Sequence, residues 1–283
     1  MQPSNKNRSD TAKLHQDLVD LLLKRQNIVS PEVEMAFRTV PRHLFLPGVT
    51  PEEAYRDQAI PVKVVDGQFL STSSQPAMMA IMLEQLQLRP GMRVLEIGAG
   101  TGYNASLMAH IVGKSGQVIT IDIDEDIVEG ARTHLAEAGY GHVQVLCADG
   151  AQGCAQAAPY DRIILTVSAG DIAPDWLHQL APGGRLLLPL ALRSMQVSVA
   201  FEQKQDHLAS VSVKACGFVG LRGMLAEPDT MVKLYEEPGQ GMLFIRSGTA
   251  RQVNPQKLYQ AIYGPFREQL VGFEATAQQV FCG

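Results

Sequence analysis

Between residues 93 and 192 the sequence alternates short apolar runs with helical stretches, and this alternation constrains the fold more than any other feature. The runs are rich in Val, Ile and Leu and cover 93–98, 116–124, 143–149, 160–168 and 184–192. The stretches between them with helical spacing are 103–112, 125–138 and 172–181. Strands that are apolar on both faces and alternate with helices predict a doubly wound α/β fold with a mostly parallel sheet.

The segments on either side of this region differ from it. Before it we expect two N-terminal helices, the second starting at Ser30 and ending before Pro41. A proline-rich loop region with short extended pieces follows over 41–76, and then a helix over 76–88. After it, 197–216 reads as an antiparallel edge hairpin, 241–248 as a strand and 254–264 as a short helix. We therefore divide the chain into 1–75 with the N-terminal helices, 76–223 as the sheet domain, and 224–283 as a small α+β appendage.

The charge balance argues against a nucleic-acid partner, because 24 Lys and Arg stand against 29 Asp and Glu, for a net charge of −5. No apolar run approaches membrane-spanning length, and the N-terminus lacks the apolar stretch of a secretory signal. The four cysteines, Cys147, Cys154, Cys216 and Cys282, form no C-x-x-C pair and are expected to be free thiols. We expect a cytoplasmic protein with no membrane partner, and the oligomeric state stays open.

The first strand ends in a glycine-rich turn, "VLEIGAGTGYNASLMAH" at 94–110. Ligands of such sheets bind at the carboxyl ends of the strands, and glycines there let a ligand approach the backbone. A dinucleotide fingerprint would need glycine where Tyr103 stands, and no lysine follows as a phosphate loop requires. The spacing G-x-G-x-G after an acid instead resembles motif I of the S-adenosylmethionine-dependent methyltransferases.

That resemblance implies S-adenosyl-L-methionine as the cofactor. The seven histidines show no metal-ligand spacing such as H-E-x-x-H, so we expect no metal. Asp122, at the end of the second strand, can accept both ribose hydroxyls, and Asp149, at the end of the third, stands where these enzymes hold the adenine amino group. Taken singly, the glycines could be only a tight turn and each aspartate only a helix cap. The expected cofactor-binding residues are Glu96, Gly98, Ala99, Gly100, Thr101, Gly102, Asp122, Ile123, Asp149 and Gly150.

Motifs ahead of and behind this region suggest the substrate. They are "VPRHLFLP" at 40–47, "AYRDQAIPV" at 54–62, "SSQPAMMA" at 73–80 and "GFVGLRG" at 217–223. Together they resemble the protein-L-isoaspartate O-methyltransferase family from about Ser30 to Gly223. The resemblance implies methyl transfer to a carboxylate of an L-isoaspartyl residue in a protein or peptide, giving an ester that collapses to a succinimide. The family's serine for the substrate carboxylate maps onto Ser74, with Ser71, Thr72, Ser73, Gln75 and Val219 as further substrate-binding residues.

The sequence departs from the family pattern around this serine. The family places threonine and one apolar residue before it, whereas "GQFLSTSSQP" at 67–76 is a few residues longer and richer in hydroxyls. The longer loop and the extended C-terminus are similar to a peptide-tailoring offshoot that methylates aspartate in ribosomally made peptides. Three hypotheses follow: a repair enzyme for isoaspartyl residues, a tailoring enzyme for a precursor peptide, or a cofactor-binding module without catalysis.

The chemistry itself needs few side chains. A carboxylate is already a nucleophile at neutral pH, so no general base is required. The reacting oxygen, methyl carbon and sulfur must lie nearly in line, so orientation carries much of the rate. We expect Ser74 to hold the carboxylate by hydrogen bonding, since a salt bridge would stabilise the ground state.

Overall fold

The five apolar runs form neighbouring parallel strands in the computed structural model, which describes residues 5–192, 195–205, 207–226, 230–237 and 241–247. They are β3 (Arg93–Ile97), β4 (Gln117–Asp122), β5 (Gln144–Cys147), β6 (Tyr160–Leu165) and β7 (Leu180–Leu192). The predicted edge hairpin is present as β8 (Met195–Gln203) and β9 (Leu208–Cys216), both antiparallel to their neighbours. The sheet order β5-β4-β3-β6-β7-β8-β9 reverses between β3 and β6, which is the switch point where such sheets bind ligands.

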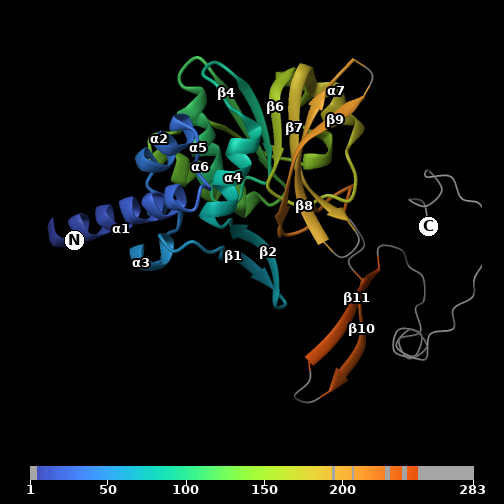
Figure 1. Ribbon diagram of the computed structural model, residues 1–283, viewed down its shortest axis with the longest axis horizontal. Helices are drawn as coiled ribbons and strands as arrows, with labels where there is room; N and C mark the ends of the chain where they lie inside the picture. Colours follow the sequence, from blue (N-terminus) through green and yellow to red (C-terminus); the bar gives the residue numbers. More distant parts are fainter. Residues whose placement is uncertain (1–4, 193–194, 206, 227–229, 238–240, 248–283) are drawn as a thin grey trace, which may run out of the picture. The chain divides into compact units, whose positions relative to one another are not determined.

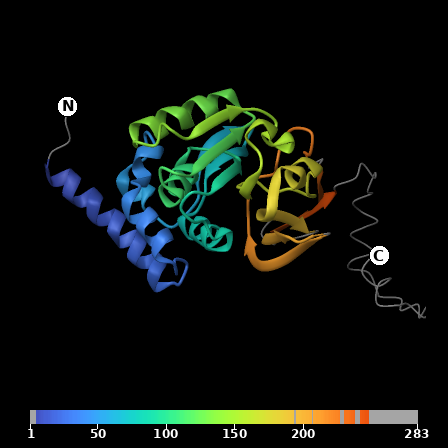
Figure 2. The ribbon, with the colours of Figure 1, turned by 90° about the horizontal axis from the view of Figure 1, so that it is seen from above.

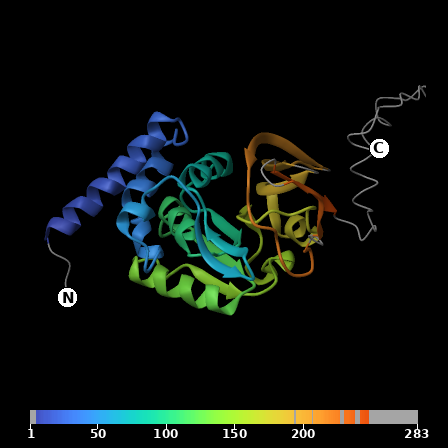
Figure 3. The same ribbon diagram turned by 90° about the horizontal axis from the view of Figure 1, so that it is seen from below.

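Helices cover both faces of the sheet, as predicted for a doubly wound fold (Figures 1, 2 and 3). One face packs against α4 (Pro76–Leu86), α5 (Tyr103–Val112) and α6 (Glu125–Glu137), with α1 (Asn5–Lys24) and α2 (Pro31–Thr39) outside them. The other face packs against α7 (Pro174–Gln179) and the short helices η2 (Gly150–Gln152) and η3 (Ala155–Ala157). Each face has its own apolar core, so β3, β4, β6 and β7 are buried on both sides, while the edge strand β5 is partly exposed.

Helix α2 illustrates how local signals set an element. Ser30 is its N-cap and accepts a hydrogen bond from the Val33 amide, and Pro31 occupies the first helical position. The helix ends at Thr39, before Pro41, because the residue ahead of a proline is pushed out of the helical region.

The stretch over 41–75 is more ordered than the sequence suggested. It contains η1 (Arg42–Phe45), α3 (Pro51–Ala54), and an antiparallel pair, β1 (Ile60–Val65) and β2 (Gln68–Ser73). Asp66 and Gly67 connect the two strands with φ angles of 49° and 77°. An Asp-Gly pair favours a two-residue hairpin turn. Our interpretation expected short extended pieces in this segment but did not use this signal to pair them.

The chain divides into two compact units, Met1–Glu227 and Pro228–Gly283, so the N-terminal helices belong to the same unit as the sheet. In the second unit the structure describes a hairpin of β10 (Thr230–Glu237) and β11 (Gly241–Ser247), of which only β11 was expected. The predicted helix over 254–264 lies outside the described residues. The predicted three-part division of the chain stays a prediction.

Over the described residues, no helix is long and apolar enough to cross a membrane. In the same part of the chain no cluster of His, Cys, Asp or Glu could hold a metal ion. Cys147, Cys154 and Cys216 are free thiols, while Cys282 lies outside the described residues. The cytoplasmic location stays a prediction.

Candidate active site

A pocket opens at the carboxyl ends of β3, β4 and β6, at the switch point of the sheet. Its walls come from the glycine turn after β3, the end of β4, the β1–β2 hairpin and the segment after β9. The lining residues are Leu70, Ser71, Thr72, Ile97, Gly98, Gly100, Ile121, Asp122, Ile123, Gly150, Thr166, Val167, Val219, Gly220, Leu221 and Arg222.

The turn after β3 requires glycine at its first position. Gly98 has φ +101°, and a Cβ there would lie 2.5 Å from Thr166 Oγ1. The Thr166 hydroxyl donates to the Gly98 carbonyl at 2.6 Å, so the turn and the end of β6 are fixed together. The missing side chain at Gly98 therefore lets β6 approach the turn that forms the pocket floor.

Asp122 is oriented by the same turn. Its Oδ2 accepts a hydrogen bond from the Gly100 amide at 3.1 Å, while Oδ1 accepts only a long one, 3.4 Å, from the Asp124 amide. Burial raises the pKa of Asp122. A carboxylate with this much spare acceptor capacity, facing a pocket, suits a pair of neighbouring hydroxyl groups.

Of the expected cofactor-binding residues, Gly98, Gly100, Asp122, Ile123 and Gly150 line this pocket. The other five, Glu96, Ala99, Thr101, Gly102 and Asp149, do not line it, and their binding role stays a prediction. Three of these five have clear structural tasks.

Glu96 lies beneath the turn and is fully buried. Its carboxylate accepts from Thr120 Oγ1 at 2.6 Å and from Asn104 Nδ2 at 2.7 Å. Burial raises the pKa of Glu96 to about 7, although both hydrogen bonds favour the ionised form. Glu96 thus links β4 to the start of α5.

Gly102 begins α5 with φ +85°, a conformation that glycine adopts without strain. A Cβ at this position would lie 3.0 Å from Leu135 Cγ of α6. Its missing side chain therefore makes room for a neighbouring helix.

Asp149 uses both carboxylate oxygens on the backbone. Oδ1 accepts from the Ala151 amide at 2.9 Å, which caps η2, and Oδ2 accepts from the Met224 amide at 2.7 Å. Asp149 thereby fastens the segment after β9 to the end of β5.

A second pocket adjoins the first and contains the predicted substrate serine. It is lined by Ala59, Phe69, Thr72, Ser74, Gln75, Met78, Gln196, Ala215, Cys216, Gly217, Phe218 and Val219. Thr72 and Val219 line both pockets. The two pockets therefore meet between the end of β2 and the segment after β9.

The four neighbouring hydroxyl residues of 71–74 have different surroundings. Ser71 lines the first pocket, Ser74 the second, and Thr72 both. Ser73 lines neither pocket, and its buried Oγ has no hydrogen-bond partner among the residues that the structure describes. The substrate-binding role of Ser73 stays a prediction.

Two residues of the N-terminal motifs fix Ser74 and the start of α4. The fully buried Arg42 donates from Nε to the Ala54 carbonyl and from Nη2 to the Ser74 carbonyl, both at 3.0 Å. Asp57 Oδ1 accepts from the Ala77 amide at 2.9 Å, in the first turn of α4. Burial lowers the pKa of Arg42 to about 10.

The segment after β9 is held by a side chain that our sequence analysis did not single out. Gln196 accepts from the Phe218 amide at 2.6 Å and donates to the Phe218 carbonyl at 3.1 Å. Ser168 continues the attachment, since its amide donates to the Val219 carbonyl at 2.8 Å. Gln196 thus positions Val219 at the junction of the two pockets.

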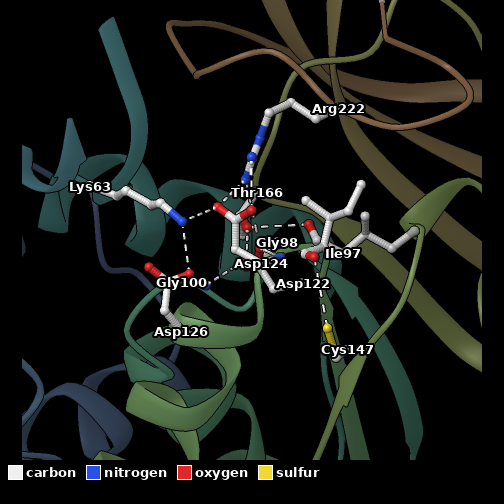
Figure 4. A network of polar contacts seen from close by, with 11 residues as sticks. Lys63, Ile97, Gly98, Gly100, Asp122, Asp124, Asp126, Cys147, Thr166 and Arg222 are labelled. Carbon is white, nitrogen blue, oxygen red and sulfur yellow. Dashed lines mark hydrogen bonds and ion pairs between the residues drawn. The ribbon is translucent and has the colours of Figure 1, made fainter. Parts of the chain in front are cut away.

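Charged side chains from three segments meet beside the first pocket (Figure 4). Arg222 donates two hydrogen bonds to Asp124, at 3.0 and 2.8 Å. Lys63 of the hairpin lies 3.0 Å from Asp124 and 2.7 Å from Asp126. Hydrogen bonds from Arg222, and then from Lys63, lower the pKa of Asp124. Sequence reasoning missed this cluster, although Arg222 belongs to the quoted motif at 217–223.

Comparison with known proteins gives a consistent result. Residues 12–225 match the family described as Protein-L-isoaspartate(D-aspartate) O-methyltransferase. Protein-L-isoaspartate O-methyltransferase 2 of Archaeoglobus fulgidus is 43% identical over 204 residues, covering 71% of this chain and 90% of the relative. The corresponding protein of Hyperthermus butylicus is 40% identical over 215 residues, covering 73% and 87%.

Solved structures show the same fold. A structure titled protein-L-isoaspartate O-methyltransferase aligns with TM-score 0.70 and 34% identity, covering 75% of this chain and 67% of that one. A putative protein-L-isoaspartate O-methyltransferase of Plasmodium falciparum, solved in complex with S-adenosyl-L-homocysteine, aligns with TM-score 0.64. It is 22% identical and covers 74% of this chain and 98% of that one, so it supports the fold alone.

Proposed function

Because the chain belongs to the protein-L-isoaspartate(D-aspartate) O-methyltransferase family, we propose that it methylates the free carboxylate of L-isoaspartyl residues in proteins or peptides, with S-adenosyl-L-methionine as the methyl donor. The observation that carries the site assignment is that Thr72 and Val219 line both pockets. A donor in the first pocket and an acceptor in the second would face each other between these two residues.

The first pocket fits a nucleoside cofactor. Asp122 has free acceptor capacity for the two ribose hydroxyls, and the turn beside it lines the pocket with two residues that lack side chains, Gly98 and Gly100. When bound, S-adenosyl-L-methionine supplies a methyl group on a positively charged sulfur. The residues of this chain then have to hold the nucleoside and direct the methyl carbon toward the junction with the second pocket.

The second pocket fits a carboxylate acceptor. Ser74 offers a hydroxyl donor, and none of the described residues that line this pocket is basic. A hydroxyl orients the carboxylate without the tight ground-state binding of a salt bridge. Since a carboxylate is ionised at neutral pH, its oxygen can attack without help from a general base.

The residues that set the angle of attack are Ser74 on one side and Val219 on the other. In the transfer, an O–C bond forms as the C–S bond breaks, and the electron pair stays on sulfur. Holding oxygen, carbon and sulfur in line is therefore the main contribution of the protein. Gln196 and Arg42 support this alignment, because they fix the backbones of Phe218 and Ser74.

The activity is tested with a pair of peptides that differ only in one linkage. The enzyme is incubated with radiolabelled S-adenosyl-L-methionine and either an isoaspartyl peptide or its aspartyl twin, and base-labile methyl ester is counted. We expect ester on the isoaspartyl peptide and none on its twin. Ester on the aspartyl twin would instead support the peptide-tailoring hypothesis, and ester on neither, with cofactor binding intact, would contradict the proposal.

A further inference from the structure

We propose that Asp124 holds the guanidinium of Arg222 away from Asp122 and thereby keeps the Asp122 carboxylate available to the cofactor. This inference rests on the proposed function, in which Asp122 binds the ribose hydroxyls. Asp124 is then a positioning residue, since it lies outside the pocket lining and acts through Arg222.

The geometry around Arg222 suggests this role. Both terminal nitrogens of its guanidinium donate to the two oxygens of Asp124, at 3.0 and 2.8 Å. The same Nη2 lies 4.0 Å from Asp122 Oδ1, too far for a hydrogen bond. Figure 4 shows the guanidinium beside both carboxylates, with the paired contacts directed to Asp124.

Asp124 is itself held in place from two sides. Its amide donates a long hydrogen bond, 3.4 Å, to Oδ1 of Asp122, the last residue of β4. Its Oδ2 lies 3.0 Å from Lys63 Nζ, and Lys63 also contacts Asp126 at 2.7 Å. The β1–β2 hairpin therefore helps to fix the carboxylate that receives Arg222.

If Asp124 is removed, Arg222 still has a carboxylate nearby in the described part of the chain, that of Asp122 at 4.0 Å. Arg222 lines the pocket, and Asp122 is the more buried of the two aspartates, with an exposed fraction of 11% against 17%. A charge-assisted hydrogen bond between them would be strong in this setting. This hydrogen bond would occupy Oδ1 of Asp122, the oxygen that now accepts the longer of its two hydrogen bonds. Arg222 would then compete with a ribose hydroxyl for that oxygen.

The test is a second-site rescue, measured as S-adenosyl-L-homocysteine affinity by calorimetry. We expect Asp124→Ala to weaken binding about tenfold, the effect of losing one hydrogen bond to a charged group. Adding Arg222→Gln to Asp124→Ala should restore affinity to within about twofold of Arg222→Gln alone, because the competitor is gone. Asp126→Ala removes an equal charge from the same cluster and should change affinity less than about twofold.

Asp124→Asn serves as a second variant, because its amide oxygen can still accept one hydrogen bond from Arg222, and its loss of affinity should be smaller. Thermal unfolding of each variant checks that the fold is retained. Normal affinity in Asp124→Ala, or a double variant as weak as Asp124→Ala, would overturn the inference. If the wild-type enzyme does not bind S-adenosyl-L-homocysteine, or if Asp122→Asn binds it as tightly as the wild type, the ribose site of the proposed function is refuted instead.

Discussion

Arg42 and Ser74 lie 32 residues apart, yet the guanidinium Nη2 of Arg42 donates to the Ser74 carbonyl at 3.0 Å. Arg42 also stands over the ring of Tyr103, 5.1 Å from its centroid. A buried cation in the core of the N-terminal region therefore fixes the backbone of the residue that we assign to the substrate carboxylate. The motif at 40–47 and the motif at 73–80 are two parts of one structural unit.

Replacing Arg42 by Lys should destabilise the protein strongly. Lysine keeps the charge but cannot reach the Ala54 and Ser74 carbonyls together, so we expect a loss of about 2–4 kcal/mol in the free energy of unfolding. Urea denaturation measures this. Arg38→Lys is the matched control, since Arg38 forms ion pairs with Asp20 and Glu34 at the surface and should lose under about 1 kcal/mol. Equal losses in both variants would contradict this assignment.

Ser74→Ala should separate catalysis from cofactor binding. The variant lacks the hydroxyl proposed to hold the substrate carboxylate, so we expect kcat/KM for an isoaspartyl peptide to fall about tenfold or more. Affinity for S-adenosyl-L-homocysteine should stay unchanged, because Ser74 lines the second pocket and not the first. A parallel loss of cofactor affinity would refute this role for Ser74.

Ser73→Ala should stabilise the protein. The Ser73 hydroxyl is buried and finds no hydrogen-bond partner in the described part of the chain, and an unsatisfied buried group carries a desolvation penalty. We expect the free energy of unfolding to rise by about 1 kcal/mol. A drop in stability would mean that the hydroxyl has a partner.

Glu96 should make stability depend on pH. Its pKa is raised to about 7 in the folded protein, mainly by burial, so the folded state binds the proton more tightly than the unfolded state. The stabilisation of the folded state that comes from this raised pKa of Glu96 is fully present below the ordinary glutamate pKa. It is lost as the pH rises to about 7. We expect Glu96→Gln to match the wild type near pH 4.5 and to exceed it above pH 7 by up to about 3 kcal/mol. Urea denaturation of both proteins across this pH range measures the difference. A wild type more stable than Glu96→Gln at pH 8 would contradict the raised pKa of Glu96.

The central fold follows from local sequence patterns. The strands of the parallel sheet are read from their apolar runs because burial on both faces demands such runs, and α2 from its cap and prolines. The β1–β2 hairpin also had a local signal, in Asp66 and Gly67, which was missed because the surrounding prolines suggested an irregular segment.

Only part of the site could be predicted from the sequence. The glycine turn and Asp122 stand beside one another after neighbouring strands, so pattern and topology place them together. The side of the site formed by the segment after β9 depends on contacts between distant residues. Asp124 and Arg222 are 98 positions apart, and Gln196 of β8 binds Phe218, which follows β9. No periodicity encodes such pairs, since they arise only once β9 folds back beside β8.

The methyl transfer rate of Val219→Trp tests most directly whether donor and acceptor meet between Thr72 and Val219. The bulky ring should obstruct the junction and misalign the reacting groups, lowering the transfer rate to an isoaspartyl peptide at least about a hundredfold. Val213→Trp, on the exposed face of β9, is the matched control and should transfer normally. Both variants should unfold at the wild-type temperature. If Val219→Trp transfers the methyl group at the wild-type rate, donor and acceptor do not meet between Thr72 and Val219.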